Sequence, residues 1–164
     1  MRRLAPALII VGLLAAALTA PAHAEHAPKR IGDSITLKGL SGERIRVKVI
    51  RVIDPATGGE FDQPKAAHRY VGVYVQLKNV GRKTYRDSPS NSGTLVTTGD
   101  KQASSALLAE GECSSEFGGS VRLSPGSKRR GCLPFEVRDG REPQEFQFAL
   151  NSGFADDFGE WRLR

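Results

Sequence analysis

The residues best suited to chemistry in this sequence are its two cysteines, Cys113 and Cys132. A cysteine nucleophile needs a nearby base, and a zinc site needs about four ligands. Neither is supported here, because C-x-x-C and H-x-x-x-H spacings are absent and His26 and His68 follow no cysteine-protease pattern. An even number of cysteines is typical of structural disulfides when a chain is exported, and the N-terminal segment considered below predicts export. We therefore predict a Cys113–Cys132 disulfide, no metal site, no cofactor and no catalytic residue.

Basic residues form a second group that can bind ligands. Three of them alternate along one predicted strand and share a face, and a run of three more follows a Ser-Pro-Gly turn. If the two groups adjoin, they form a patch suited to an anionic cell-wall polymer or to phospholipid. The alternative is a solvated sheet face and a charged turn that guards an edge strand against aggregation. The candidate anionic-ligand residues are Arg44, Arg46, Lys48, Lys128, Arg129 and Arg130.

Acidic residues cluster in two loops, with Glu60 and Asp62 in one and Asp156, Asp157 and Glu160 in the other. Paired carboxylates can bind calcium or serve a glycosidase, but neither cluster has the spacing of an EF-hand loop. The nucleophile motifs G-x-S-x-G and S-x-x-K are absent, and no glycine-rich phosphate loop precedes a helix. We interpret the acidic residues as solvated loop charges and do not expect an enzyme.

The N-terminal segment has the layout of a secretory signal peptide. Arg2 and Arg3 precede an apolar run, and Ala22-His23-Ala24 is an A-x-A cleavage pattern. The apolar run is short for a membrane span, which needs about 20 residues. Cleavage after Ala24 removes both arginines and lowers the formal net charge from +6 to +4. We expect a signal peptide at residues 1–24, a short tail at 25–32 and one secreted domain at 33–164, with no membrane span after cleavage.

Alternation of apolar and polar residues is the main signal for secondary structure. It predicts strands at 34–38, 43–54, 70–78, 93–98, 120–123, 132–137, 145–150 and 160–164. The phase slips near Val49–Ile50, which predicts a β-bulge or a strand that changes sheets. Pro134 lacks an N–H, so its strand should be an edge strand or a bulged one. Residues 103–111 are the only helix candidate, with a strand or a 3₁₀ turn as alternatives. Short strands without βαβ alternation predict an all-β, immunoglobulin-like antiparallel sandwich of about seven to nine strands.

Four segments, in this order, resemble a known family: "IGDSITL", "RYVGVYVQLKNVGRKTY", "LSPGSKRRGCLPFEV" and "EFQFAL". They are similar to the secreted telokin-like domains of unknown function common in actinobacteria, a family that includes the mycobacterial immunoprotective extracellular protein. The resemblance spans most of residues 31–164 and implies an immunoglobulin-like sandwich. It implies no settled activity and no catalytic residues. The chain departs from many relatives because it lacks a lipoprotein cysteine and a long polar linker, so we expect release rather than tethering.

These observations predict a secreted, non-catalytic interaction module of unknown ligand. Its partner would be an extracellular protein or a cell-wall polymer. The alternatives are a cell-wall polyanion-binding protein that uses the basic residues and an enzyme with an unrecognised carboxylate site. Nucleic acid is not expected as a partner, because the charge excess is small and outward-facing Tyr70 and Tyr74 are too few for a stacking platform. We expect a monomer.

Overall fold

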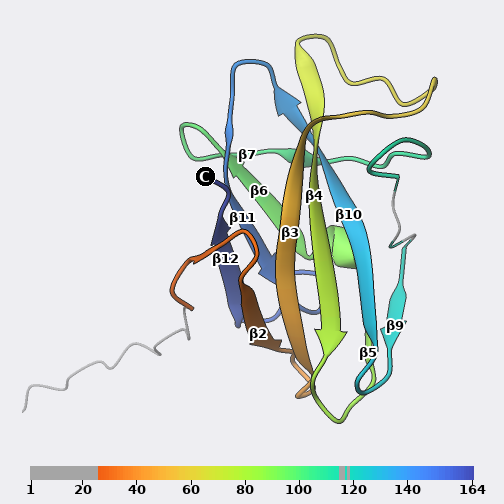
Figure 1. The fold of residues 1–164 in the computed structure, drawn as a ribbon, viewed down its shortest axis with the longest axis vertical. Helices are drawn as coiled ribbons and strands as arrows, with labels where there is room; N and C mark the ends of the chain where they lie inside the picture. The colour runs from red at the N-terminus through yellow and green to blue at the C-terminus, as the bar shows by residue number, and fades with distance from the viewer. Residues whose placement is uncertain (1–25, 115–116, 118) are drawn as a thin grey trace, which may run out of the picture.

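Two five-stranded β-sheets packed face to face form the domain (Figure 1). The computed structural model describes residues 26–114, 117 and 119–164, so the expected signal peptide at residues 1–24 lies outside the described part. One sheet has the order β1 (Lys29–Arg30), β12 (Phe158–Arg162), β11 (Pro143–Ala149), β6 (Gly93–Thr97) and β7 (Lys101–Gln102). The other has the order β2 (Ser34–Lys38), β3 (Arg44–Ala56), β4 (His68–Asn79), β10 (Lys128–Arg138) and β8 (Ser104–Ser105). A separate two-stranded sheet pairs β5 (Tyr85–Asp87) with β9 (Val121–Leu123), and a short 3₁₀ turn covers Pro89–Asn91.

The long strands follow the alternation of the sequence. The buried faces of β4 and β10 are made by Val71, Val73, Val75, Leu77, Leu133, Phe135 and Val137. The register between β3 and β4 shifts between Val49 and Arg51, which confirms the predicted bulge. The extra residue explains how Val49 and Val52, which have opposite parity, both pack against the core.

Aromatic rings join the two sheets at the centre of the core. Phe135 of β10 meets Phe146 of β11 edge-on, with ring centroids 6.3 Å apart. Phe146 also contacts Phe148 and Trp161, each with a centroid distance of 6.1 Å. All four rings are buried. The molecule is therefore an all-β, immunoglobulin-like sandwich, as predicted.

Of the twelve strands in the described residues, seven are five or more residues long, and the other five have two or three residues. One of these short strands, β1, comes from the segment that was expected to be an N-terminal tail and pairs with β12. Segment 103–111 forms no helix, and the strand alternative is confirmed only for Ser104–Ser105, which form β8 and pair with Phe135 and Glu136 of β10. The helix-forming alanines and leucines are overridden by tertiary contacts, since Leu108 is buried beside the cysteines.

Pro134 lies in β10, the last long strand before the edge of its sheet. Beyond β10 there is only β8, which pairs with two residues. The backbone oxygen of Pro134 faces that side, where it accepts a hydrogen bond from the Ala106 N–H at 2.9 Å. The missing N–H therefore costs no bond to β4. The prediction of an edge or bulged strand is wrong, because β10 lies between β4 and β8 and pairs with β4 without a register shift.

Candidate functional site

The outer face of the β2–β3–β4–β10 sheet carries a compact array of cations. Strand β4 lies between β3 and β10 and brings the two predicted groups of basic residues together (Figure 1). Arg46, Lys78 and Lys128 are aligned across the three strands. In the next outward-facing row, Lys48 and Arg130 flank Gln76. We define the basic face as Arg44, Arg46, Lys48, Lys78, Lys128 and Arg130.

The spacing of these cations follows from β-sheet geometry. Neighbouring strands are about 4.8 Å apart, and successive residues on one face of a strand are about 7 Å apart. The backbone positions of Arg46, Lys78 and Lys128 therefore span about 10 Å. This arrangement places positive charges at regular intervals in two directions.

One predicted member does not belong to the basic face. Arg129 is aligned with Leu77, whose side chain is buried in the core, so Arg129 points to the other side of the sheet. A run of consecutive residues on a strand cannot share one face, because successive side chains alternate. Lys78, by contrast, was not among the candidates. Its outward position in the alternating segment 70–78 was the signal that could have found it.

Carboxylates of the described residues do not neutralise the positive charge of the basic face. Four of its side chains are exposed and two, Lys48 and Lys78, are half-buried. Within the described part of the chain, none of the six forms an ion pair with an acidic residue. Arg130 donates a hydrogen bond from Nε to Gln76 Oε1 at 2.9 Å, which orients its guanidinium without removing its charge. Clustered like charges on a sheet are mutually unfavourable, so an anionic ligand would relieve repulsion here.

The basic face ends at Tyr74, where the outer surface becomes apolar. The Arg51 guanidinium lies over the Tyr74 ring, 5.1 Å from its centroid. Beyond this pair lies a small cluster of apolar side chains that contains Cys113 and Cys132. The two cysteines form a disulfide with a Cα–Cα distance of 5.1 Å, which confirms the prediction. The bond fixes the loop that follows β8 onto the outer face of β10.

Gly72 of β4 makes room for the disulfide. A Cβ atom at this position would lie 2.6 Å from Cys113 Sγ and 2.7 Å from Cys132 Sγ. These separations are too short for any side chain, so only glycine fits between the two strands at this level. Gly72, the disulfide and the loop are therefore one packing unit.

Two of the acidic residues singled out in the sequence, Asp62 and Asp157, bind the backbone of distant segments, so the interpretation as solvated loop charges is wrong for them. Glu160 lies in strand β12 and not in a loop. Asp62 Oδ2 accepts hydrogen bonds from the backbone N–H groups of Gly59, Ala109 and Glu110 at 3.2, 2.8 and 3.2 Å. These bonds, the one from Glu110 foremost, lower the pKa of Asp62 below its usual value. Asp157 accepts from the Lys38 N–H at 2.7 Å and contacts His26 Nε2 at 2.8 Å. The described residues contain no group of three or more His, Cys, Asp or Glu side chains arranged to hold a metal ion.

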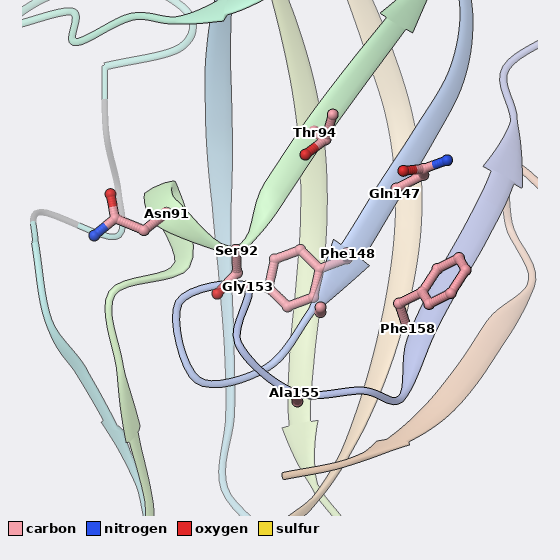
Figure 2. Close-up of a pocket in the computed structure, with 9 residues that line it drawn as sticks. Asn91, Ser92, Thr94, Gln147, Phe148, Gly153, Ala155 and Phe158 are labelled. Carbon is pink, nitrogen blue, oxygen red and sulfur yellow. The ribbon is translucent and has the colours of Figure 1, made fainter. Parts of the chain in front are cut away.

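A shallow hollow of about 240 Å³ opens on the other sheet (Figure 2). Thr94 of β6, Gln147 of β11 and Phe158 of β12 line it, together with residues of the loops below them. Its described lining offers hydroxyl, amide and aromatic groups and includes no titratable side chain. The hollow can hydrogen-bond a neutral polar group, but it lacks a general acid or base.

The described residues contain no helix whose length and hydrophobicity would allow it to cross a membrane. No protein of curated function matches the sequence. Several solved structures share the fold, including the following three. The secreted protein MPT63 of Mycobacterium tuberculosis has a TM-score of 0.62 and 13% identity over 85% of this chain and 98% of its own. The yjhA protein of Bacillus subtilis has a TM-score of 0.59 and 14% identity over 83% of this chain and 99% of its own.

The third structure is ycdA of Bacillus subtilis subsp. subtilis str. 168, with a TM-score of 0.56 and 20% identity over 72% of this chain. This chain spans only 35% of the length of ycdA. At these identities the likeness establishes the shared fold. A family model described as a domain of unknown function, DUF4352, matches residues 31–157, which is most of the sequence. The chain therefore belongs to the DUF4352 family.

Proposed function

We propose that this protein is an extracellular binding module without catalytic activity, and that the basic face is its contact surface for an anionic polymer of the cell surface. The observation that carries the proposal is the alignment of Arg46, Lys78 and Lys128 across three strands, with Lys48 and Arg130 in the next row. A regular array of unpaired cations suits a chain whose anions repeat at short intervals. A single small anion would use only part of it.

The extracellular location has four supports. The N-terminal segment predicts export with cleavage after Ala24. The Cys113–Cys132 disulfide is of a kind that persists in oxidising compartments. MPT63, a protein of the same fold, is secreted. The resemblance of the sequence to secreted telokin-like domains of actinobacteria also supports an extracellular location.

Binding to a carboxylated dextran tests the proposal, with uncharged dextran of the same length as the matched polymer control. Exposed charges are screened over about 8 Å at physiological ionic strength, so affinity should fall steeply as salt rises from low to physiological concentration. Reversing Arg46→Glu and Arg130→Glu together should weaken binding at low salt by at least about tenfold, since several exposed charge contacts are lost or inverted.

The matched control reverses Lys29→Glu and Lys101→Glu, two exposed cations on strands of the other sheet. This control changes the net charge equally and should leave binding within about twofold of the natural protein, if position rather than total charge decides affinity. Equal losses in both double variants would contradict a localised surface. Binding that does not depend on salt would contradict an electrostatic contact and would favour binding through loops. A robust hydrolytic activity of the purified protein would overturn the non-catalytic role.

A further inference from the structure

A second concentration of positive charge lies on the small sheet of β5 and β9, beside the main sheets (Figure 1). Arg86 of β5 and Arg122 of β9 are directly opposite each other in this antiparallel pair. Directly opposite residues have Cβ atoms about 5 Å apart, and like charges in this position repel. Both arginines are exposed, and neither forms an ion pair with any carboxylate among the described residues. Among the described residues, two guanidinium groups therefore stand side by side, and the one carboxylate near them is that of Asp87, which lines the same hollow.

Asp87, the residue that follows Arg86 in β5, accepts several hydrogen bonds that fix its side chain. Asp87 Oδ2 accepts hydrogen bonds from Tyr85 Oη at 2.6 Å, Ser92 Oγ at 3.2 Å and the Ser152 N–H at 3.0 Å. Its Oδ1 accepts from the Ser88 N–H at 2.8 Å and from Ser152 Oγ at 2.7 Å. Both carboxylate oxygens are thus occupied by donors of the protein itself. The network fixes the loops that follow β5 and β11 around the arginine pair.

The other end of the small sheet is anchored by Asn79, which is fully buried. Its Nδ2 donates to the backbone oxygens of Lys83 at 2.7 Å and Leu123 at 2.9 Å, and its Oδ1 accepts from the Gly81 N–H at 2.9 Å. These bonds tie the turn before β5 to the end of β9. Arg86 and Arg122 therefore project from a support that is fixed at both ends.

A hollow of about 370 Å³ lies at the arginine pair. Its polar lining consists of Arg86, Asp87, Ser88, Ser120, Arg122 and Ser152. Ser88 Oγ and Ser120 Oγ form a long hydrogen bond of 3.4 Å, which uses the proton of one hydroxyl and leaves the proton of the other for a ligand. The described lining thus combines two forked cationic donors with serine hydroxyls, and the oxygens of its one carboxylate, Asp87, already accept hydrogen bonds from the protein.

We propose that this hollow binds a tetrahedral oxoanion, phosphate or sulfate, either as the free ion or as a group on a larger molecule. Guanidinium groups bind such oxygens in a bidentate manner, and two of them facing one hollow outweigh the single negative charge of Asp87. The serine hydroxyls reach oxygens that the arginines leave free, which a planar carboxylate does not provide. The site is separate from the basic face and does not depend on the polymer-binding role.

Amide chemical-shift titrations with inorganic phosphate, sulfate, acetate and chloride at one ionic strength test this proposal. Phosphate and sulfate should give saturable shifts at residues 86–88, 120–122 and 152, and acetate and chloride should bind at least about fivefold more weakly. A parallel titration with methyl phosphate tests whether the hollow also binds a phosphate group that is esterified to a larger molecule. If methyl phosphate binds with an affinity similar to that of phosphate, the site accepts a phosphate group on a larger molecule. If methyl phosphate does not bind, the site accepts only the free ion.

Arg86→Gln and Arg122→Gln should each weaken phosphate binding by at least about tenfold, because one bidentate contact is lost. Lys29→Gln, an equal change in net charge on the other sheet, should leave it within about twofold. The glutamine variants should melt at or above the temperature of the natural protein, since they remove a cross-strand repulsion. Arg86→Lys keeps the charge but loses the fork, and should bind more weakly than the natural protein. Absence of saturable shifts, or unchanged affinity in the Arg86→Gln and Arg122→Gln double variant, would overturn the proposal.

Discussion

Asp87 keeps a charge in a half-buried position because hydrogen bonds outweigh the cost of burial. Burial raises the pKa of Asp87, but hydrogen bonds from the side chains of Tyr85 and Ser152 and from the backbone of Ser152 and Ser88 lower it further, so the pKa lies below its usual value. A carboxyl group with a lowered pKa in the folded state stabilises the protein above the pKa that the group has in the unfolded chain. That stability is lost as the pH falls through the folded-state pKa.

The Asp87→Asn variant is therefore expected to lower the free energy of unfolding at pH 7 by about 2 kcal/mol, because a charge-assisted network loses its acceptor. The loss relative to the natural protein should begin to shrink as the pH falls below about 4, the pKa of the group in the unfolded chain, and should be smallest below the lowered folded-state pKa, where Asp87 is neutral in the folded protein too. Urea denaturation at several pH values measures both effects. Asp100→Asn, at an exposed residue with φ of 53°, is the control and should change stability little at any pH. A pH-independent loss in Asp87→Asn would contradict the account.

At the scale of elements, Gly72 and the disulfide join a loop to two strands. Gly72→Ala should lower the free energy of unfolding by about 1–3 kcal/mol, because its methyl group would press against both sulfur atoms. In a Cys113→Ala and Cys132→Ala background the same substitution should cost much less, since the sulfur atoms are gone. The cysteine replacements themselves should cost roughly 3 kcal/mol through loop-closure entropy. A double-mutant cycle by urea denaturation measures the coupling, and additive losses would show that Gly72 and the disulfide are independent.

Elements with a strong local pattern were predictable from the sequence, and those defined by distant partners were not. The alternation in β4 and the phase slip at Val49 are local signals, and both were read correctly. Segment 103–111 has helix-forming residues, but contacts with β10 decide its structure, and these lie far away in the sequence. The same reason explains why the pairing of Arg86 with Arg122 was missed, because register between separate segments is set by the folded sheet. Arg129 was misplaced because a run of charges was treated as a single patch.

For the whole molecule, the distribution of charge is more informative than its sum. The formal net charge of the full chain is only +6, yet six cations gather on one face of one sheet. Net charge governs solubility and long-range attraction, whereas clustered charge selects a surface for binding. The sandwich creates this cluster by placing β4 between β3 and β10, so that residues 44–48 and 128–130 flank β4 on the same sheet.

The most direct test of the central claim is an amide chemical-shift map of the protein titrated with a short carboxylated dextran at low salt. The hollow at β5 and β9 is proposed to bind phosphate or sulfate and to bind carboxylates weakly. A carboxylated polymer therefore reports on the basic face and not on the hollow. Our account predicts that the largest shifts fall at residues 44–48, 76–78 and 128–130, and that physiological salt reduces them. Shifts concentrated on the other sheet or spread evenly over the surface, or no shifts at low salt, would contradict the account.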